Sequence, residues 1–261
     1  MLLSLLTDFG TGDYYVAAVK GTVLRLAPGT ALVDVSHQVP PGDVETAAFL
    51  LAAAVPSFPA GTVHLAVVDP GVGSGRRILA VRTPAALFVA PDNGLLGAFL
   101  DGLDGAEVRS VERSDLFLAG PGQTFHGRDR FAPVAAWLLR GGRMDELGPE
   151  IGDPVRLPAA PPRRAPGRIS GRVIHIDRYG NLVTDIPAGW LPAGPCRAEV
   201  GGSAACATSR RVTHYAEIPA GEAAMLAGSL GTLELSLNGE DLARRWSVAR
   251  GAAVELTWNG S

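Results

Sequence analysis

The organisation of this chain follows from one stretch, Val67-Val68-Asp69-Pro70-Gly71-Val72-Gly73-Ser74-Gly75-Arg76-Arg77. An apolar run from residue 62 predicts a buried strand that ends at an acid, and the loop beyond carries three glycines before Arg76. Open α/β sheets bind ligands beyond the carboxyl ends of their strands. Glycine permits positive φ and close backbone approach, so the spacing can fold Arg76 back over Asp69. The stretch predicts a ligand site, and an ordinary turn with a surface ion pair is the alternative.

Composition favours a small-molecule site over a nucleic-acid or membrane partner. Of the 261 residues, 47% are hydrophobic and 19% charged, and the formal net charge is -3 without a long run of one sign. The apolar start reaches Asp8 too soon for a signal sequence, and the apolar stretch at 47–55 is too short to span a bilayer. Cys196 and Cys206 match no zinc or redox spacing. We therefore expect a cytoplasmic globular protein.

Two further acidic loops follow predicted strands. A strand at 2–6 ends before Asp8, and a helix at 14–26 and a strand at 31–35 follow it. Asp8 ends its strand as Asp69 does and is interpreted as a ligand contact, whereas Asp13 is better placed to cap the helix.

A second helix is expected at 42–54 and a strand pair at 78–81 and 87–90. Asp92 then opens the third acidic loop, before a predicted helix at 95–100. Because Asp-Asn-Gly is also good turn chemistry, a cap and turn is favoured over a ligand contact for Asp92.

His126 lies where a loop meets a predicted helix at 131–139, which follows a strand at 105–112. It stands between Phe125 and Gly127, not on an apolar helix face, so it can reach a cleft. A structural or merely solvated histidine is the alternative.

The chain is expected to fold as two domains with a proline-rich linker between them. Residues 1–157 predict a Rossmann-like α/β sandwich domain, and residues 158–167 contain too many prolines for regular structure. Beyond the linker, residues 168–261 lose the helical period and predict a smaller C-terminal β-barrel domain. Its strands are expected at 169–177, 181–186, 198–200, 231–237 and 253–258.

Two stretches of this second domain carry polar groups in places that suit a ligand. Asp177, Tyr179 and Asn181 share a turn between strands and can hold an amino group, stack on a base and read its edge, although an ordinary hairpin turn is the alternative. Ser229 lies among glycines, where its hydroxyl and free N–H groups can take a carboxylate. Glu234 stands within an apolar strand and needs a partner if it is buried.

These motifs occur together in the order of a known family. The chain carries Thr7-Asp8-Phe9-Gly10, Asp69 to Gly73 with Arg76, Pro91-Asp92-Asn93-Gly94, Phe125-His126-Gly127-Arg128-Asp129, Asp177 to Asn181, and a glycine-serine-glycine strand. Together they resemble the S-adenosyl-L-methionine hydroxide adenosyltransferase family, which is related to the fluorinase and chlorinase enzymes. The resemblance runs over nearly the full length.

The resemblance implies hydrolysis of S-adenosyl-L-methionine to adenosine and L-methionine, without metal or cofactor, in a homotrimer with inter-subunit active sites. It places the catalytic Asp-Arg-His set on Asp69, Arg76 and His126. It also assigns substrate contacts: Asp8 to the ribose hydroxyls, Asn181 to adenine, and Asp177, Ser229 and, more weakly, Asp13 to the methionine end. The halogenating relatives lack the Asp-Arg-His set, so the resemblance disfavours halogenation.

The residue types suit this chemistry, because a sulfonium is already a good leaving group and the enzyme mainly has to aim an oxygen nucleophile. We expect Asp69 and His126 to orient and partly deprotonate water, while Arg76 fixes Asp69. A metal-dependent phosphohydrolase using Asp8, Asp69, Asp92 and His126 is one alternative, although the tight histidine-carboxylate spacing of metal sites is missing. A non-catalytic adenosine-binding protein is another.

Two positions depart from the family pattern. Gly228 stands where asparagine commonly precedes the serine, and Asp185 stands after Thr184 where asparagine is frequent. Both departures concern the methionine end and its neighbourhood, and neither touches the Asp-Arg-His set.

Overall fold

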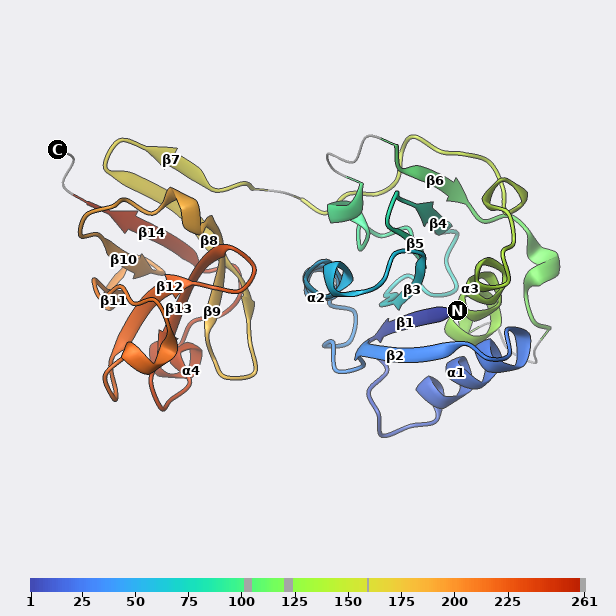
Figure 1. The fold of residues 1–261 in the computed structure, drawn as a ribbon, viewed down its shortest axis with the longest axis horizontal. Coiled ribbons are helices and arrows are strands. Elements are labelled where there is room, and N and C mark those ends of the chain that lie inside the picture. The colour runs from blue at the N-terminus through green and yellow to red at the C-terminus, as the bar shows by residue number, and fades with distance from the viewer. Residues whose placement is uncertain (101–104, 120–123, 159, 259–261) are drawn as a thin grey trace. The chain divides into compact units, whose positions relative to one another are not determined.

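The computed structural model describes residues 1–100, 105–119, 124–158 and 160–258. The chain divides into two compact units, Met1–Pro158 and Ala159–Ser261. Figure 1 shows each unit built around a sheet of its own. Within the described residues, no helix is long and apolar enough to cross a membrane.

The N-terminal unit alternates strands and helices. Its elements are β1 (Leu2–Thr7), α1 (Tyr15–Leu26), β2 (Ala31–Ser36), α2 (Val44–Ala54), β3 (Thr62–Val67), β4 (Ile78–Arg82), β5 (Ala86–Pro91), β6 (Glu107–Ser110) and α3 (Ala132–Leu139). Short 3-10 turns lie at Val55–Ser57, Gly97–Phe99, Ser114–Leu116 and Met144–Glu146, and a π-helical turn at Gly127–Phe131 runs directly into α3.

The six strands form one sheet in the order β2-β1-β3-β5-β4-β6. β1, β2, β3 and β5 run parallel, and β4 and β6 pair antiparallel at one side. Helices α1 and α3 cover one face, where Val19 and Val134 are buried, and α2 covers the other with Leu51 against the core around Phe88. This three-layer arrangement confirms the predicted α/β sandwich and brings the carboxyl ends of β1, β3 and β5 to the same edge.

Two local predictions in this unit are wrong. The helix expected at 95–100 is only the short turn Gly97–Phe99, preceded by Gly94 at φ +94°. Leu95 and Leu96 are buried in the core around Phe88 without forming an α-helix. Helix α1 begins after Tyr14 without a side-chain cap, so Asp13 does not have the capping role that we expected. Asp43 does cap α2, accepting from the Thr46 amide at 3.0 Å.

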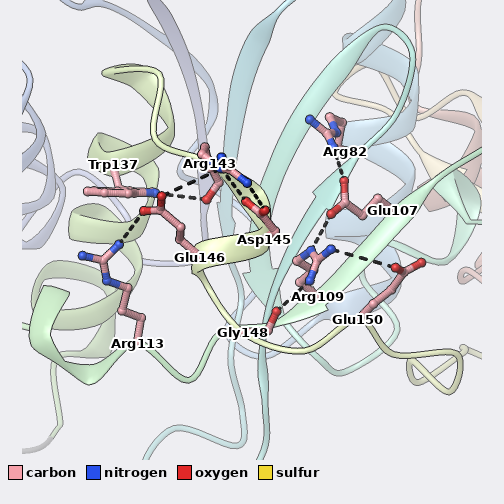
Figure 2. A network of polar contacts seen from close by, with 10 residues as sticks. All are labelled: Arg82, Glu107, Arg109, Arg113, Trp137, Arg143, Asp145, Glu146, Gly148 and Glu150. Atoms are coloured by element: carbon pink, nitrogen blue, oxygen red, sulfur yellow. Dashed lines mark hydrogen bonds and ion pairs between the residues drawn. The ribbon is translucent and has the colours of Figure 1, made fainter.

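A charged network holds strand β6, the last strand of the sheet (Figure 2). Glu107 pairs with Arg82 of β4 and with Arg109, which also donates to the Gly148 carbonyl at 2.9 Å. Burial alone would raise the pKa of Glu107, but hydrogen bonds from Arg109 and Arg82 lower it below its ordinary value. The outer edge of β6 is also covered by backbone, because the Ser110 amide donates to the Pro149 carbonyl at 3.0 Å and the Ile151 amide donates to the Val108 carbonyl at 2.9 Å. We therefore interpret this network as structural.

The C-terminal unit is almost entirely β. Its elements are β7 (Arg163–Ala165), β8 (Arg168–Ile176), β9 (Leu182–Pro187), β10 (Arg197–Val200), β11 (Ser203–Thr208), β12 (Ala223–Ala227), β13 (Thr232–Leu237), α4 (Leu242–Trp246) and β14 (Ala253–Thr257), with 3-10 turns at Ala188–Trp190 and Tyr215–Glu217. The main sheet order is β11-β10-β14-β8-β9-β13-β12, and β7 pairs with β8.

This antiparallel sheet is a nearly closed barrel. Thr208, at the end of β11, donates to the Ala223 carbonyl of β12 at 2.7 Å and so joins the two edge strands. The predicted C-terminal barrel is confirmed. The absence of regular structure expected over 158–167 is wrong, because Arg163–Ala165 pairs antiparallel with β8 between the flanking prolines. Strands β11 and β12 and helix α4 were not expected, since their short alanine-containing runs carry weak periodicity.

Candidate active site

The loop after β3 folds Arg76 back over Asp69, as the glycine spacing predicts. Arg76 Nε lies 2.9 Å from each carboxylate oxygen of Asp69, and the two side chains are only 10% and 6% exposed. Gly73 at φ +83° and Ser74, whose hydroxyl donates to the Gly71 carbonyl at 2.7 Å, close the loop. This ion pair is shielded and bidentate, so it holds the Asp69 carboxylate in one orientation.

His126 joins this pair from the start of the π-helical turn. Its Nδ1 lies 3.1 Å from Arg76 Nη2, and the ring is buried. A guanidinium can only donate, so Nδ1 must accept, and the proton of the neutral imidazole is therefore on Nε2. Single π-helical turns are often found at functional sites. Asp69, Arg76 and His126 thus form one hydrogen-bonded group, although the sequence separates them by up to 57 positions.

Gly127 permits the close approach of two loops at this point. A Cβ at Gly127 would lie 3.0 Å from the ring of Phe9, which belongs to the loop after β1. In that loop, Asp8 accepts a hydrogen bond from the Gly42 amide at 2.8 Å. The Asp8 loop and the His126 turn are consequently packed together.

Asp8, Asp69 and His126 line one cavity of about 440 Å³ beyond the ends of β1 and β3. Its remaining walls are mostly aromatic or apolar, comprising Phe9, Tyr14, Tyr15, Val67, Val72, Thr124, Phe125 and Gly127. The sequence interpretation did not select the aromatic residues, although Tyr14-Tyr15 directly after an acidic loop was a signal that could have found them. Asp13 is exposed and is not among the residues that line this cavity.

His37, a buried histidine that the sequence interpretation did not select, stabilises the loop that carries Asp8. His37 Nδ1 lies 2.8 Å from the hydroxyl of Thr7, and its Nε2 lies 3.1 Å from Asp34. The His37 carbonyl accepts from the Gly10 amide at 2.8 Å. Both the backbone and the side chain of His37 therefore fix the turn that carries Asp8.

Asp92 is structural rather than a cap. It is buried and accepts from Arg77 Nε at 2.7 Å and from the Val155 amide at 2.8 Å. Arg77 also donates to Asp153 at 2.7 Å. Across the parts of the chain that are described, no group of three or more His, Cys, Asp and Glu side chains is placed to hold a metal ion. The arrangement gives the Asp92 carboxylate a guanidinium partner where the phosphohydrolase alternative requires a metal.

The C-terminal unit carries a second cavity, of about 580 Å³. Its lining includes the three residues predicted from the β8–β9 turn, Asp177, Tyr179 and Asn181, together with Tyr215, Ile218, Leu237, Asn238, Gly239, Glu240 and Asp241. Tyr179 is 75% exposed and Asn181 is buried. An aromatic ring with free faces beside a fixed amide is suited to a planar heterocycle.

Asp177 shapes this turn with both of its oxygens. Oδ1 accepts from the amides of Tyr179 and Asn181 at 2.8 and 2.9 Å, and Oδ2 accepts from Asn181 Nδ2 at 2.9 Å. The second bond orients the Asn181 amide, whose oxygen is left to accept from a ligand. The local role of Asp177 is thus to position Asn181.

Glu234 is buried and has the partners that its burial requires. Tyr215 donates its hydroxyl to Oε1 at 2.6 Å and Ser236 donates at 3.0 Å. Burial and the hydrogen bond to Glu234 raise the pKa of Tyr215 above its ordinary value. Glu234 therefore contacts the cavity only through Tyr215, a lining residue that the sequence interpretation missed.

Ser229 and the two departures from the family pattern lie outside the second cavity. Ser229 is exposed and is not among its lining residues. A Cβ at Gly228 would lie 2.9 Å from Glu234 Oε2, so glycine suits the buried carboxylate at this position. Asp185 accepts from the Arg172 amide at 2.8 Å, and burial raises its pKa above the ordinary value.

A mostly parallel sheet with an acid-lined cavity beyond its strand ends, followed by a β-barrel with an aromatic cavity, defines a two-domain α/β protein with small-molecule sites. Comparison with known proteins narrows this class. Residues 3–148 match the N-terminal domain of SAM hydroxide adenosyltransferases, and residues 171–255 match the C-terminal domain. The chain belongs to the SAM hydroxide adenosyltransferase family.

Individual relatives agree with this assignment. The chain is 38% identical to an (R)-S-adenosyl-L-methionine hydrolase from Salinispora tropica, over 98% of this chain and 97% of the relative. A fluorinase from Actinoplanes sp. is 30% identical over 71% of each chain. The crystal structure of an uncharacterized conserved protein from Thermotoga maritima superimposes with a TM-score of 0.90 at 32% identity, covering 99% of this chain and 100% of the other.

Proposed function

We propose that this chain hydrolyses S-adenosyl-L-methionine to adenosine and L-methionine. The observation that carries the proposal is the buried Asp69–Arg76–His126 group on the wall of an open cavity, in a chain aligned end to end with a relative named (R)-S-adenosyl-L-methionine hydrolase. By the same relation, we propose the (R) epimer of the sulfonium as the substrate.

In the proposed reaction, a water oxygen forms a bond to C5′ while the bond between C5′ and sulfur breaks. The electron pair of that bond goes to sulfur, which leaves as the neutral thioether of methionine. The water proton passes to Asp69 and then to solvent. Arg76 holds the Asp69 carboxylate in place for this step, which supplies orientation without a metal or other cofactor.

The tautomer of His126 refines its proposed role. Because Nδ1 accepts from Arg76, a neutral His126 carries its proton on Nε2 and cannot take a proton there. It would therefore orient the water and donate to the oxygen that attacks C5′. Asp69 then acts as the base of the pair, whereas the sequence interpretation shared deprotonation between both residues.

For the substrate, we propose that Asp8 binds the ribose hydroxyls, that Asn181 reads adenine and that Tyr179 stacks on it. The lining of the two cavities supports these contacts. Ser229 and Asp13 are proposed at the methionine end, with Asp177 and Glu234 acting through Asn181 and Tyr215. We further propose a cytoplasmic homotrimer without nucleic-acid or membrane partners, and light scattering would measure the trimer directly.

The test is to incubate the purified protein with S-adenosyl-L-methionine in halide-free buffer containing a chelator, and to follow adenosine and methionine by chromatography. We expect both products in equal amounts, with turnover lost in Asp69→Asn. Asp153→Asn is the matched control, since that carboxylate also pairs with an arginine but is 80% exposed and outside the cavity. Tight adenosine binding without turnover would instead indicate a binding protein, and metal-dependent cleavage of phosphoesters alone would indicate a phosphohydrolase.

A further inference from the structure

Four aromatic rings form a cluster on the wall of the N-terminal cavity. The ring centroid of Tyr15 lies 4.6 Å from that of Tyr14, 5.1 Å from Phe125 and 6.2 Å from Phe9. Tyr14 is 61% exposed and Tyr15 is 38% exposed. The cluster thus presents accessible ring surface to whatever occupies the cavity.

The charges around this cluster leave the cavity wall negative. Asp69 is paired with Arg76, but Asp8 accepts only a backbone hydrogen bond, and no ion pair to Asp8 is found among the described residues. Arg128 stacks on Phe125 at 5.0 Å, and its charge is matched by Asp129 at 2.6 Å. An uncompensated carboxylate beside the negative faces of aromatic rings favours a cation.

We propose that the aromatic cluster, together with Asp8, selects for the positive charge of the sulfonium. This inference rests on the proposed function, which places C5′ beside Asp69 and His126. The sulfonium sulfur is bonded directly to C5′, and the rings line the same cavity as Asp69 and His126. The cluster then distinguishes the cationic substrate from neutral thioethers that share its adenosine and amino-acid parts.

Selection for charge also assists product release. Cleavage removes the positive charge from sulfur, so methionine leaves as a neutral thioether that the rings hold less tightly than the substrate. Because the rings contribute to binding and not to proton transfer, removing one should raise KM more than it lowers kcat.

The experiment uses two probes that the enzyme cannot cleave by this reaction. S-adenosyl-L-homocysteine carries a neutral thioether, and its amine analogue carries a protonated N-methyl nitrogen in place of sulfur. Calorimetric titration gives the Kd of each probe for wild type, Tyr15→Leu and Tyr15→Phe. Tyr15→Phe is the matched control because it keeps the ring.

We expect wild type and Tyr15→Phe to prefer the cationic probe, and Tyr15→Leu to reduce that preference by about threefold to thirtyfold. The more exposed Tyr14→Leu serves as a second variant with little effect on folding. An unchanged ratio in both leucine variants, or an equal loss for both probes, would overturn the inference.

The turnover assay separates this outcome from failure of the proposed function. If wild type releases adenosine while the leucine variants keep their charge preference, the cluster is not selective and the hydrolase function stands. If the preference depends on the rings but no adenosine forms, charge selection stands and hydrolysis fails.

Discussion

Nη2 of Arg76 donates a hydrogen bond to Nδ1 of His126 across 3.1 Å. The same guanidinium is bidentate to Asp69, so a single side chain sets the orientation of both candidate catalytic groups. Only the planar fork of arginine can serve both partners at once.

Arg76→Lys should therefore reduce kcat much more than an ordinary charge-conserving substitution. An ammonium cannot hold both Asp69 oxygens and also fix His126, and we expect a loss of about tenfold to a hundredfold. Steady-state kinetics would measure this loss, with Arg82→Lys as the control at an exposed position of β4. Wild-type kcat in Arg76→Lys would contradict the joint role.

Asp177→Asn should weaken adenosine binding without slowing the chemical step. An amide at 177 can still accept from the turn amides, but its NH₂ group would face the NH₂ group of Asn181 and turn that amide away. We expect KM to rise about tenfold, because the substitution removes roughly one hydrogen bond between adenine and a fixed amide. Glu240 lines the same cavity, so Glu240→Gln is the control and should keep the wild-type KM. A wild-type KM in Asp177→Asn would show that Asn181 is oriented by other contacts.

Asp92→Ala should destabilise the N-terminal unit and leave any activity equally resistant to chelator. The substitution leaves Arg77 and the Val155 amide without their buried acceptor, and we expect a loss of about 1–3 kcal/mol in the free energy of unfolding. Urea denaturation would measure this loss. The phosphohydrolase alternative would be favoured if Asp92→Ala kept the wild-type free energy of unfolding and if the activity of the wild-type protein required a metal ion.

His64 should make the stability of the N-terminal unit depend on pH. Burial lowers the pKa of His64 to about 4 from the ordinary 6.5, and the ring packs between Phe58 and Phe88. Below pH 6.5 the unfolded chain gains a proton there that the folded chain does not take up until about pH 4, so stability falls as pH falls through this window.

Between pH 7.5 and 4.5, we expect this residue to remove on the order of 2 kcal/mol from the free energy of unfolding. His64→Gln keeps a polar partner for Ser4, which lies 2.6 Å from Nδ1, and should flatten the dependence. His214→Gln is the control, because His214 is exposed, and it should leave the pH dependence of stability unchanged. Equal pH slopes for wild type and His64→Gln in urea titrations would contradict the assignment.

The parts of the fold that follow from local pattern were predictable. Apolar runs that end at acids predict that Asp8 and Asp69 lie at one edge of the sheet, because parallel strands carry their carboxyl ends to the same side. The contact between Arg76 and Asp69 was also predictable, because the glycines between them allow the loop to fold back.

Contacts between residues that are far apart in the sequence could not be predicted. Nothing near Tyr215 in the sequence indicates that its hydroxyl bonds to Glu234, and Phe9 and Phe125 meet only because Gly127 has no side chain. The α-helix predicted at 95–100 does not form, although its apolar residues Leu95 and Leu96 are buried in the core. Pairings of this kind depend on the fold as a whole, which a single sequence window does not contain.

The π-helical turn at Gly127–Phe131 makes the placement of His126 a matter of chain length. Such a turn holds one more residue than an α-helical turn, and each residue of an α-helix advances the chain by about 100°. Deleting one residue here would swing His126 away from Arg76 while every other amino acid kept its identity. The position of His126 therefore depends on the number of residues in this turn as well as on the absence of a side chain at Gly127.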